Sequence, residues 1–182
     1  MVKRLILITG MSGSGKTTLV NHFKNRGVAS VTMGDVIRSL AQEKGLSPTP
    51  ENFGRLATGI REEGGADAVA NLCVEKIEKM PDDIVLVDGI RSIREVEVFS
   101  KEFEVALVAV FADQKTRYAR LSARGRSDDP PDMATFKARD ARELSFGLGH
   151  AIALADHTVL NEGSLEDLEA EFENLWSLLD WV

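Results

Sequence analysis

The chain has 182 residues and a formal net charge of −7, with 43% hydrophobic and 28% charged residues. These proportions are ordinary for globular proteins and exclude a mainly disordered chain. A chain of this length fits one domain that needs no disulfide or metal to hold it, and its single cysteine excludes a disulfide framework. The longest strictly apolar run, residues 105–112, is too short for a membrane helix, so we expect a cytoplasmic protein without a membrane partner.

The acidic residues are unevenly distributed. Residues 143–182 contain nine Asp or Glu and neither Lys nor Arg, so this part accounts for the net negative charge. Such an acidic part argues against nonspecific binding to nucleic acid, and we expect no nucleic-acid partner. The charge of the first 142 residues is compatible with a phosphate ligand.

Short apolar runs alternate with amphipathic stretches along the chain, which predicts strands separated by helices. The runs predict strands at 5–9, 28–32, 84–88, 105–111 and 157–160. The other stretches predict helices at 17–24, 35–44, 50–62, 66–80, 92–101, 113–124, 132–146 and from 164 onward. Ser92, Asp113 and Ser164 are expected N-caps. Together the pattern predicts an α/β fold, a three-layer sandwich in which a parallel sheet has helices on both faces.

Two stretches depart from a simple alternation of strands and helices. Residues 35–80 are predicted as helices only, and residues 125–147 place a loop and a helix between the last two strands. Ligands of parallel α/β sheets bind at the carboxyl ends of the strands. Each of the two stretches could therefore cover one side of a site at that edge.

Residues 10–17, Gly-Met-Ser-Gly-Ser-Gly-Lys-Thr, match the pattern G-x-x-x-x-G-K-[ST] between a predicted strand and a predicted helix. The glycines let the backbone N–H groups face a phosphate, and the helix adds its positive N-terminus. Lys16 can reach the β- and γ-phosphates of ATP, and the Thr17 hydroxyl can bind Mg²⁺. The expected nucleotide-binding residues are Gly10, Ser12, Gly13, Ser14, Gly15, Lys16, Thr17 and Thr18.

A carboxylate ends the third predicted strand. Asp88 follows the apolar run 84–87, opposite the phosphate loop in a parallel sheet. A carboxylate at that position can hold Mg²⁺ or one of its water ligands, so Asp88 and Thr17 are the expected metal residues. The alternative is an aspartate that merely ends a strand.

Three further stretches resemble the adenylate-kinase-type nucleoside monophosphate kinases. Residues 33–38, Met-Gly-Asp-Val-Ile-Arg, resemble their G-D-x-x-R segment, and residues 88–91, Asp-Gly-Ile-Arg, resemble their D-G-x-x-R with the arginine one residue early. Residues 126–129, Arg-Ser-Asp-Asp, followed by Arg139, resemble their R-x-D-D…R lid. Residues 155–163 are more similar to the dephospho-CoA kinases, in which the Asn-x-Gly region lies near the nucleotide base; Asn161 is assigned there on this ground.

The resemblance implies a P-loop kinase in which residues 1–182 form a single domain. It implies the strand order 2-3-1-4-5, a helical acceptor-binding lobe at about 35–80 and a lid at about 120–145. ATP and Mg²⁺ are the implied cofactors, a small nucleotide-like molecule is the implied acceptor, and the protein is expected to be a monomer or homodimer. The nearest resemblance overall is to an archaeal branch of adenylate-kinase-related proteins without a secure substrate assignment.

Arginines are the residues expected to neutralise the transferring phosphoryl group, because the guanidinium matches phosphate oxygens and stays charged. Arg38 and Arg91 are assigned to the acceptor together with Asp35, whose alternatives are a helix cap and an aid to the metal. The expected catalytic residues are Lys16, Arg120, Arg124 and Arg126. Arg117 is interpreted as part of a solvated face paired with aspartates such as Asp140, whereas Arg139 and Arg142 fit either a lid or the surface.

The acceptor base cannot be derived from the sequence. Where the adenylate kinases have an apolar stretch after a glycine, residues 62–67 read Glu-Glu-Gly-Gly-Ala-Asp. The main hypothesis is therefore an ATP-dependent phosphotransferase acting on a nucleotide or nucleotide-like molecule. The alternatives are a dephospho-CoA kinase-like activity and a nucleotide-dependent ATPase or switch with a protein or RNA partner.

Overall fold

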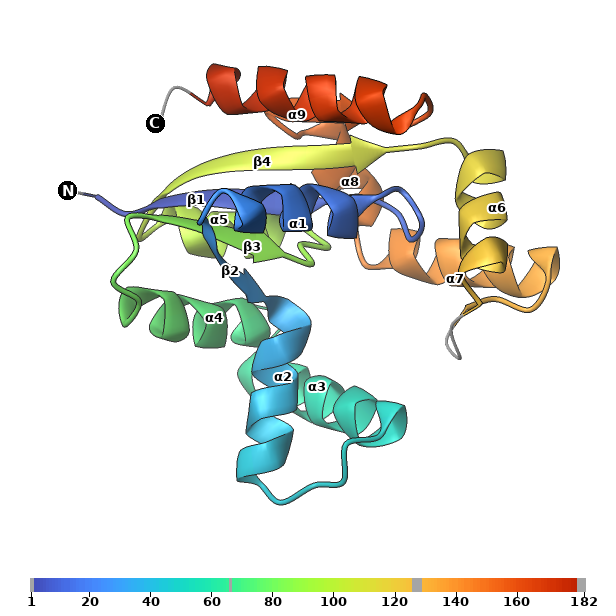
Figure 1. Ribbon diagram of the computed structural model, residues 1–182. Coiled ribbons are helices and arrows are strands. Elements are labelled where there is room, and N and C mark those ends of the chain that lie inside the picture. The colour runs from blue at the N-terminus through green and yellow to red at the C-terminus, as the bar shows by residue number, and fades with distance from the viewer. Residues whose placement is uncertain (1, 66, 126–128, 180–182) are drawn as a thin grey trace.

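A computed structural model describes residues 2–65, 67–125 and 129–179 of the chain. Within these ranges a parallel sheet is formed by β1 (Arg4–Thr9), β2 (Ala29–Thr32), β3 (Ile84–Asp88), β4 (Glu104–Phe111) and β5 (His157–Leu160). Its strand order is β2-β3-β1-β4-β5, which confirms the predicted fold class and strand order. Because the strands are parallel, their carboxyl ends meet at one edge (Figure 1).

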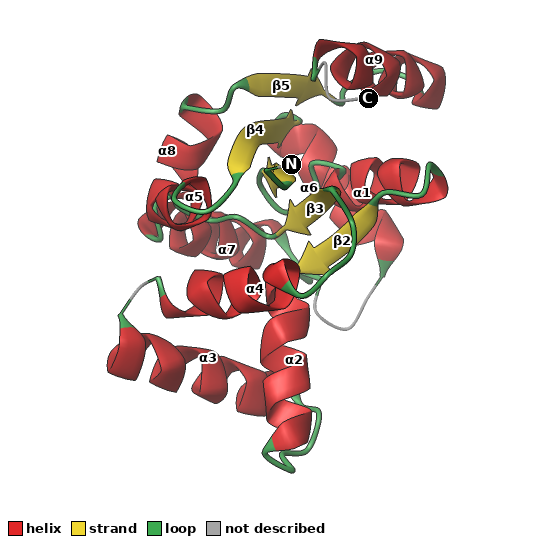
Figure 2. Ribbon diagram, turned by 90° about the vertical axis from the view of Figure 1, so that its left-hand side faces the viewer, coloured by secondary structure: helices red, strands yellow, loops and turns green. Residues whose placement is uncertain are grey.

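Helices cover both faces of the sheet (Figure 2). They are α1 (Lys16–Asn25), α2 (Met33–Glu43), α3 (Pro50–Gly64), α4 (Ala68–Glu78), α5 (Ile93–Ser100), α6 (Gln114–Arg124), α7 (Met133–Ser145), α8 (Leu148–Ala153) and α9 (Leu165–Leu178). Three expected N-caps are confirmed, since the side chains of Ser92, Asp113 and Ser164 accept hydrogen bonds from the backbone N–H three residues later.

The short helix α8 is absent from the sequence-based prediction. It has six residues, fewer than two turns, so it contains too little periodicity to be recognised. Leu148 and Ala151 are its buried residues. Tertiary packing of these two side chains, rather than intrinsic propensity, stabilises a helix of this length.

Two apolar clusters lie on opposite faces of the sheet. Leu5 and Leu7 of β1 belong to the cluster that packs against α2, α4 and α5, whereas Ile6 and Ile8 belong to the cluster under α1 and α9. Alternate side chains of β1 therefore point into different layers, and the strand is buried on both faces. The fully buried Cys73 of α4 lies in the first cluster.

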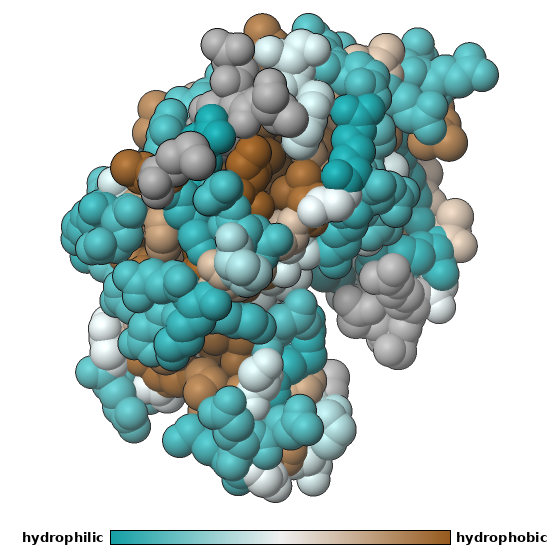
Figure 3. Space-filling model, turned by 60° about the vertical axis from the view of Figure 1, so that its left-hand side comes forward, coloured by the Kyte–Doolittle hydropathy of each residue, from teal (hydrophilic) through white to brown (hydrophobic). Residues whose placement is uncertain are grey.

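Helices α2 and α3 project from the body of the molecule below the edge strand β2 (Figure 1). Helix α2 begins directly where β2 ends, and α3 is capped by Thr49, whose Oγ1 accepts a hydrogen bond from Asn52 N at 3.2 Å. In the space-filling view of Figure 3 the surface is mostly hydrophilic, and hydrophobic residues show in the recesses. No helix within the described ranges has the length and apolarity needed to cross a bilayer.

The substitution Phe23→Ala tests the second cluster. Phe23 of α1 is fully buried and its ring centroid lies 5.3 Å from that of Trp176. We expect the free energy of unfolding, measured by chemical denaturation, to fall by about 3–5 kcal/mol because the substitution leaves a cavity between sheet and helices. Leu165→Ala on the exposed start of α9 is the control, with an expected change below about 0.5 kcal/mol.

Candidate nucleotide and acceptor site

The phosphate loop, residues 10–17, joins β1 to α1 at the carboxyl edge of the sheet and is packed tightly against its neighbours. A Cβ atom added at Gly10 would lie 2.4 Å from the Val110 carbonyl oxygen of β4. A Cβ atom added at Gly15, whose φ is +106°, would lie 2.0 Å from Nδ2 of Asn161. Only glycine allows this approach, so the glycines also determine how the loop is held by β4 and the end of β5.

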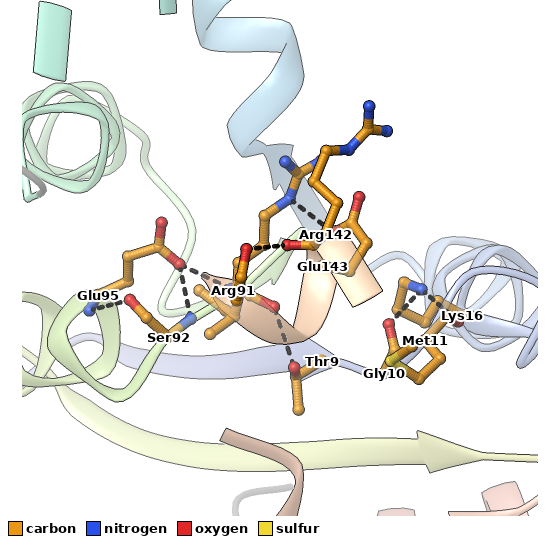
Figure 4. Close-up of polar contacts among 11 residues, drawn as sticks. Thr9, Gly10, Met11, Lys16, Arg91, Ser92, Glu95, Arg142 and Glu143 are labelled. Atoms are coloured by element: carbon orange, nitrogen blue, oxygen red, sulfur yellow. Dashed lines mark hydrogen bonds and ion pairs between the residues drawn. The ribbon is translucent and has the colours of Figure 1, made fainter. Parts of the chain in front are cut away.

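Lys16 is the first residue of α1, and its side chain folds back over the loop. Its Nζ donates hydrogen bonds to the carbonyl oxygens of Gly10 at 2.7 Å and Met11 at 3.0 Å (Figure 4). Burial lowers the pKa of Lys16 to about 8, an effect that the nearby Asp88 carboxylate partly offsets. The ammonium group is therefore held at the loop in a poorly hydrated position, where an anionic ligand would interact with it strongly.

Asn161, the first residue after β5, links the phosphate loop to α6. Its buried side chain donates from Nδ2 to the Ser14 carbonyl oxygen at 2.8 Å and accepts at Oδ1 from Arg120 Nη2 at 3.1 Å. The other terminal nitrogen of Arg120, Nη1, is buried and has no hydrogen-bond partner among the described residues. Arg120 thus keeps one donor next to the loop for a ligand atom. Thr17 and Thr18 lie exposed on the first turn of α1.

Asp88 is the last residue of β3 and lies opposite Ile8 of β1 in the sheet register. Its Oδ1 atom is buried without a hydrogen-bond partner among the described residues. Burial raises the pKa of Asp88, and the positive charge of Lys16 acts against this rise. An unpaired carboxylate oxygen beside the phosphate loop fits a magnesium ion, which commonly uses one or two protein carboxylates and takes its other ligands from water and phosphate.

Arg91 follows the turn after β3. Thr9 Oγ1 donates to the Ile90 carbonyl oxygen at 2.9 Å, and the Glu95 carboxylate accepts from the Arg91 backbone N–H at 2.7 Å, so this segment is held from both sides. The Arg91 side chain extends toward α7, where its Nε lies 3.8 Å from a carboxylate oxygen of Glu143 (Figure 4). The backbone of Arg91 is therefore fixed, whereas the long ion pair holds its guanidinium only loosely.

Arg38 and Asp35 form an ion pair on one side of α2, and both side chains are about half exposed. Arg38 Nε donates to Asp35 Oδ1 at 2.8 Å. Partial burial acts to raise the pKa of Asp35, but hydrogen bonds from Arg38 and Thr32 hold it below its usual value. The N-cap of α2 is Thr32, and Asp35 is the third helical residue. The helix-cap interpretation of Asp35 is therefore wrong.

One cavity of about 460 Å³ joins these groups. The phosphate loop, Lys16 and Asp88 line one end, and Arg38, Arg91 and Arg139 line the rest. An apolar wall comes from α2, α3, α4 and α8: Ile37, Phe53, Ala57, Val69 and Leu148. The space thus combines positively charged side chains with an apolar surface, as small-molecule pockets commonly do.

Several expected site residues lie elsewhere. Arg120 and Asn161 lie on the far side of the loop and do not line this cavity. Arg124 donates from Nε to Asp129 at 3.0 Å. Arg126 lies outside the described residues. The interpretation of Arg117 as solvated is wrong, since it is buried, although its pairing with Asp140 is confirmed.

Other lining residues were not assigned from the sequence. Phe53, Glu95, Glu143 and Leu148 line the cavity, and Arg139 joins them. Their positions depend on how α3, α5, α7 and α8 pack around the edge of the sheet. Of these, only Arg139 carried a sequence signal, its place after the R-x-D-D stretch.

The parallel sheet order and the loop between β1 and α1 define a P-loop NTPase with a kinase-like fold. Residues 6–142 match the model of a family described as AAA domain. The chain is 47% identical to a UPF0200 protein of Hyperthermus butylicus over 175 residues, covering 96% of this chain and 94% of that protein. It is 45% identical to the UPF0200 protein MJ1399 of Methanocaldococcus jannaschii over 173 residues, covering 94% and 88%. The chain therefore belongs to the UPF0200 family.

Solved structures share the fold. The shikimate kinase of Bacteroides thetaiotaomicron superposes with a TM-score of 0.66 at 18% identity, covering 99% of both chains. TT1252 from Thermus thermophilus gives a TM-score of 0.66 at 20% identity, covering 98% of this chain and 99% of that one. At these identities the likeness establishes a kinase-like architecture.

The substitution Gly15→Ala tests the packing of the phosphate loop. The new methyl group must displace the Asn161 amide, and the alanine must keep a left-handed backbone conformation that L-residues rarely adopt. We therefore expect ATP affinity, measured by titration calorimetry, to fall at least about tenfold. Gly59→Ala, in the middle of α3 with no atom within 4 Å of the new methyl group, is the control and should leave ATP affinity unchanged. Equal affinity of Gly15→Ala and the wild type would contradict this account of the loop.

The lowered pKa of Lys16 predicts a pH dependence of stability. Between its folded value of about 8 and the ordinary value of 10.5, the unfolded chain binds the Lys16 proton and the folded chain does not. The cost of burying the ammonium is complete below pH 8 and is lost as the pH rises to 10.5, so stability increases across this window. Relative to Lys16→Met, the unfolding free energy of the ligand-free wild type should rise by about 3 kcal/mol. A flat difference in denaturation measurements would refute the prediction.

Proposed function

We propose that this protein is an ATP-dependent phosphotransferase that transfers the γ-phosphate to a nucleotide or nucleotide-like small molecule. The observation that carries the proposal is the single cavity that runs from the phosphate loop and Lys16 to Arg38, Arg91 and Arg139. A P-loop protein that only hydrolyses ATP does not need three arginines beyond the γ-phosphate. A kinase with a phosphate-bearing acceptor can use them, because such an acceptor also brings negative charge.

The donor half of the proposed site is the phosphate loop with its flanking cations. The backbone of residues 10–18 surrounds the β- and γ-phosphates, and Lys16 exchanges its two carbonyl partners for phosphate oxygens. Arg120 uses its unpaired Nη1 atom on the same phosphates, held in place by Asn161. Arg124, the last residue of α6, completes the donor side by leaving Asp129, and Arg126 keeps the donor-side role expected from the sequence.

Asp88 and Thr17 are the residues that would hold magnesium. The unpaired Oδ1 of Asp88 supports this assignment. When bound, the metal supplies charge neutralisation on the β- and γ-phosphate oxygens. Burial raises the pKa of Asp88, and a bound cation would act against this rise by favouring the ionised carboxylate.

The acceptor half comprises Arg38, Arg91 and Arg139, with Asp35 beside them. Arg38 is paired with Asp35, both about half exposed, and Arg91 has only a long ion pair of 3.8 Å with Glu143, so neither pair holds its arginine strongly. An acceptor phosphate competes well with such partners, because guanidinium–phosphate pairs are strong and directional. The apolar wall around Phe53 would take the remainder of the acceptor, within a volume typical of small-molecule sites.

In phosphoryl transfer the protein mainly positions the two reactants and neutralises the charge on their phosphates. An ionised acceptor phosphate oxygen bonds to the γ-phosphorus as the bond to the β–γ bridging oxygen breaks and ADP leaves. Such an oxygen carries no proton, so transfer to a phosphate acceptor needs no general base. In this proposal the helical lobe at about 35–80 holds the acceptor, and the lid at about 120–145 excludes water from the transfer.

Transfer of label from γ-³²P-ATP tests the proposal. We expect a labelled product with a nucleoside monophosphate or with dephospho-CoA, and none with shikimate, a hydroxyl acceptor that is not a nucleotide, after separation by thin-layer chromatography. Lys16→Met should abolish the product because the γ-phosphate loses its buried cation. Label released only as phosphate, at a rate that no acceptor changes, would favour the ATPase or switch alternative instead.

Arg91→Gln is expected to separate the two halves of the site. The KM for the acceptor should rise by about ten- to a hundredfold while the KM for ATP changes less than about threefold, because a charged hydrogen bond on the acceptor side is lost. Arg94→Gln is the matched control, since Arg94 is exposed three residues along the chain and does not line the cavity. Equal increases in both KM values would remove Arg91 from the acceptor half.

A further inference from the structure

A buried ion pair joins α6 to α7. Arg117 and Asp140 are 5% and 6% exposed, and they form two parallel hydrogen bonds, Nη1 to Oδ1 at 3.0 Å and Nη2 to Oδ2 at 2.6 Å. The Arg117 guanidinium also lies over the ring of Phe136, at 5.0 Å from the ring centroid. This two-point geometry holds the two helices in one relative orientation.

The same arginine contacts the phosphate loop. Arg117 Nη1 donates to the Ser12 carbonyl oxygen at 3.1 Å. Its backbone carbonyl oxygen would lie 2.9 Å from a Cβ atom on Gly13. Side chain and backbone of Arg117 thus meet two neighbouring residues of the loop, so the start of α6 and the loop cannot shift independently.

Asp140 lies between two residues that line the cavity at the acceptor side. Arg139 precedes it and Glu143 follows one turn later, and both belong to the cavity lining. Asp140 itself faces α6. Helix α7 therefore carries the loop-linked carboxylate on one face and acceptor-side charges on another. Figure 1 shows α6 and α7 together at the carboxyl edge of the sheet.

The energetics of the ion pair indicate that it orients α6 and α7 rather than stabilising the fold. Desolvation offsets most of the attraction in a buried ion pair, so such a pair adds little net stability. Removing or separating one partner, however, leaves an uncompensated buried charge. The pair therefore permits few relative positions of the loop, α6 and α7.

We infer that Arg117 and Asp140 are positioning residues that couple the phosphate loop to α7, so that nucleotide bound at the loop fixes Arg139 and Glu143 for the acceptor. The coupling rests on the proposed function. Neither residue touches the reacting atoms. Phosphate bound by the loop restrains the Ser12 carbonyl, Arg117 transmits the restraint to Asp140, and α7 becomes more rigid.

Hydrogen–deuterium exchange on the full chain tests the coupling. In the wild type, saturating AMP-PNP with Mg²⁺ is expected to slow amide exchange across Met133–Ser145 by about tenfold. Asp140→Asn keeps the shape of the side chain without its charge, and Arg117→Lys keeps the charge without the paired donors. Both variants should still bind AMP-PNP, with the slowing in α7 reduced to less than about twofold.

Glu173→Gln on α9 is the matched control, because it removes an ion pair with Arg26 at the end of α1, away from α7. It should retain the full slowing. An effect in the wild type that persists in both variants, or no slowing in the wild type despite saturating binding, would overturn the coupling alone. A wild type that does not bind AMP-PNP would overturn the proposed function as well. Should Asp140→Asn fail to fold, the wild type and Arg117→Lys still decide between these outcomes.

Discussion

The close packing of one glycine-containing turn is the constraint on which this molecule depends. The phosphate loop touches β4 through Gly10, α6 through Gly13 and the end of β5 through Gly15. A Cβ atom at any of the three glycines would lie within 3.0 Å of a neighbouring atom, so the loop packs closely against two strands and a helix. The loop also directs its own carbonyl oxygens at Lys16. The same few residues therefore form the phosphate site and join the sheet to its helices.

Burial is the main influence on the pKa values of the charged groups around this turn. Lys16 and Asp88 lie close enough to act on each other's pKa, and desolvation is the larger effect for both. Of the arginines farther along the cavity, Arg38 is paired with the half-exposed Asp35, and Arg91 has only a long ion pair with Glu143. Near the loop the charges are thus costly to bury and closely held, whereas the guanidinium groups of Arg38 and Arg91 are about half exposed and can exchange partners. This difference suits the proposed function, in which the donor is bound tightly and the acceptor is bound and released in each cycle.

Much of the fold could be predicted because its signals are local. Buried strands such as β1 and β3 show as apolar runs, and caps such as Ser92 depend on residues three apart. The strand order is a long-range property, and it was inferred from the resemblance before the structure confirmed it. The burial of Arg117 and the cavity position of Glu143 could not be predicted, because each depends on where α7 packs and no sequence spacing encodes that contact.

The assigned roles of the site residues likewise divide into those that follow from local sequence and those that depend on long-range packing. Those of the phosphate loop follow from a contiguous pattern that fixes backbone geometry. Those of Arg38 and Arg91 require two segments to converge, and the structure brings both to one cavity. The role of Asp35 was ambiguous because an aspartate near a helix start serves equally as a cap, and Thr32 holds that position.

Cys73 is the only thiol in the chain, and it lies fully buried in α4 beneath the projecting helices. Desolvation raises the pKa of this thiol to about 12, so almost no thiolate exists near neutral pH. Because the thiolate is the reactive form, a thiol reagent reaches and modifies Cys73 only when α4 separates from the sheet. The rate at which a thiol reagent modifies Cys73 therefore reports how often α4 opens locally, and it can be measured without introducing a label.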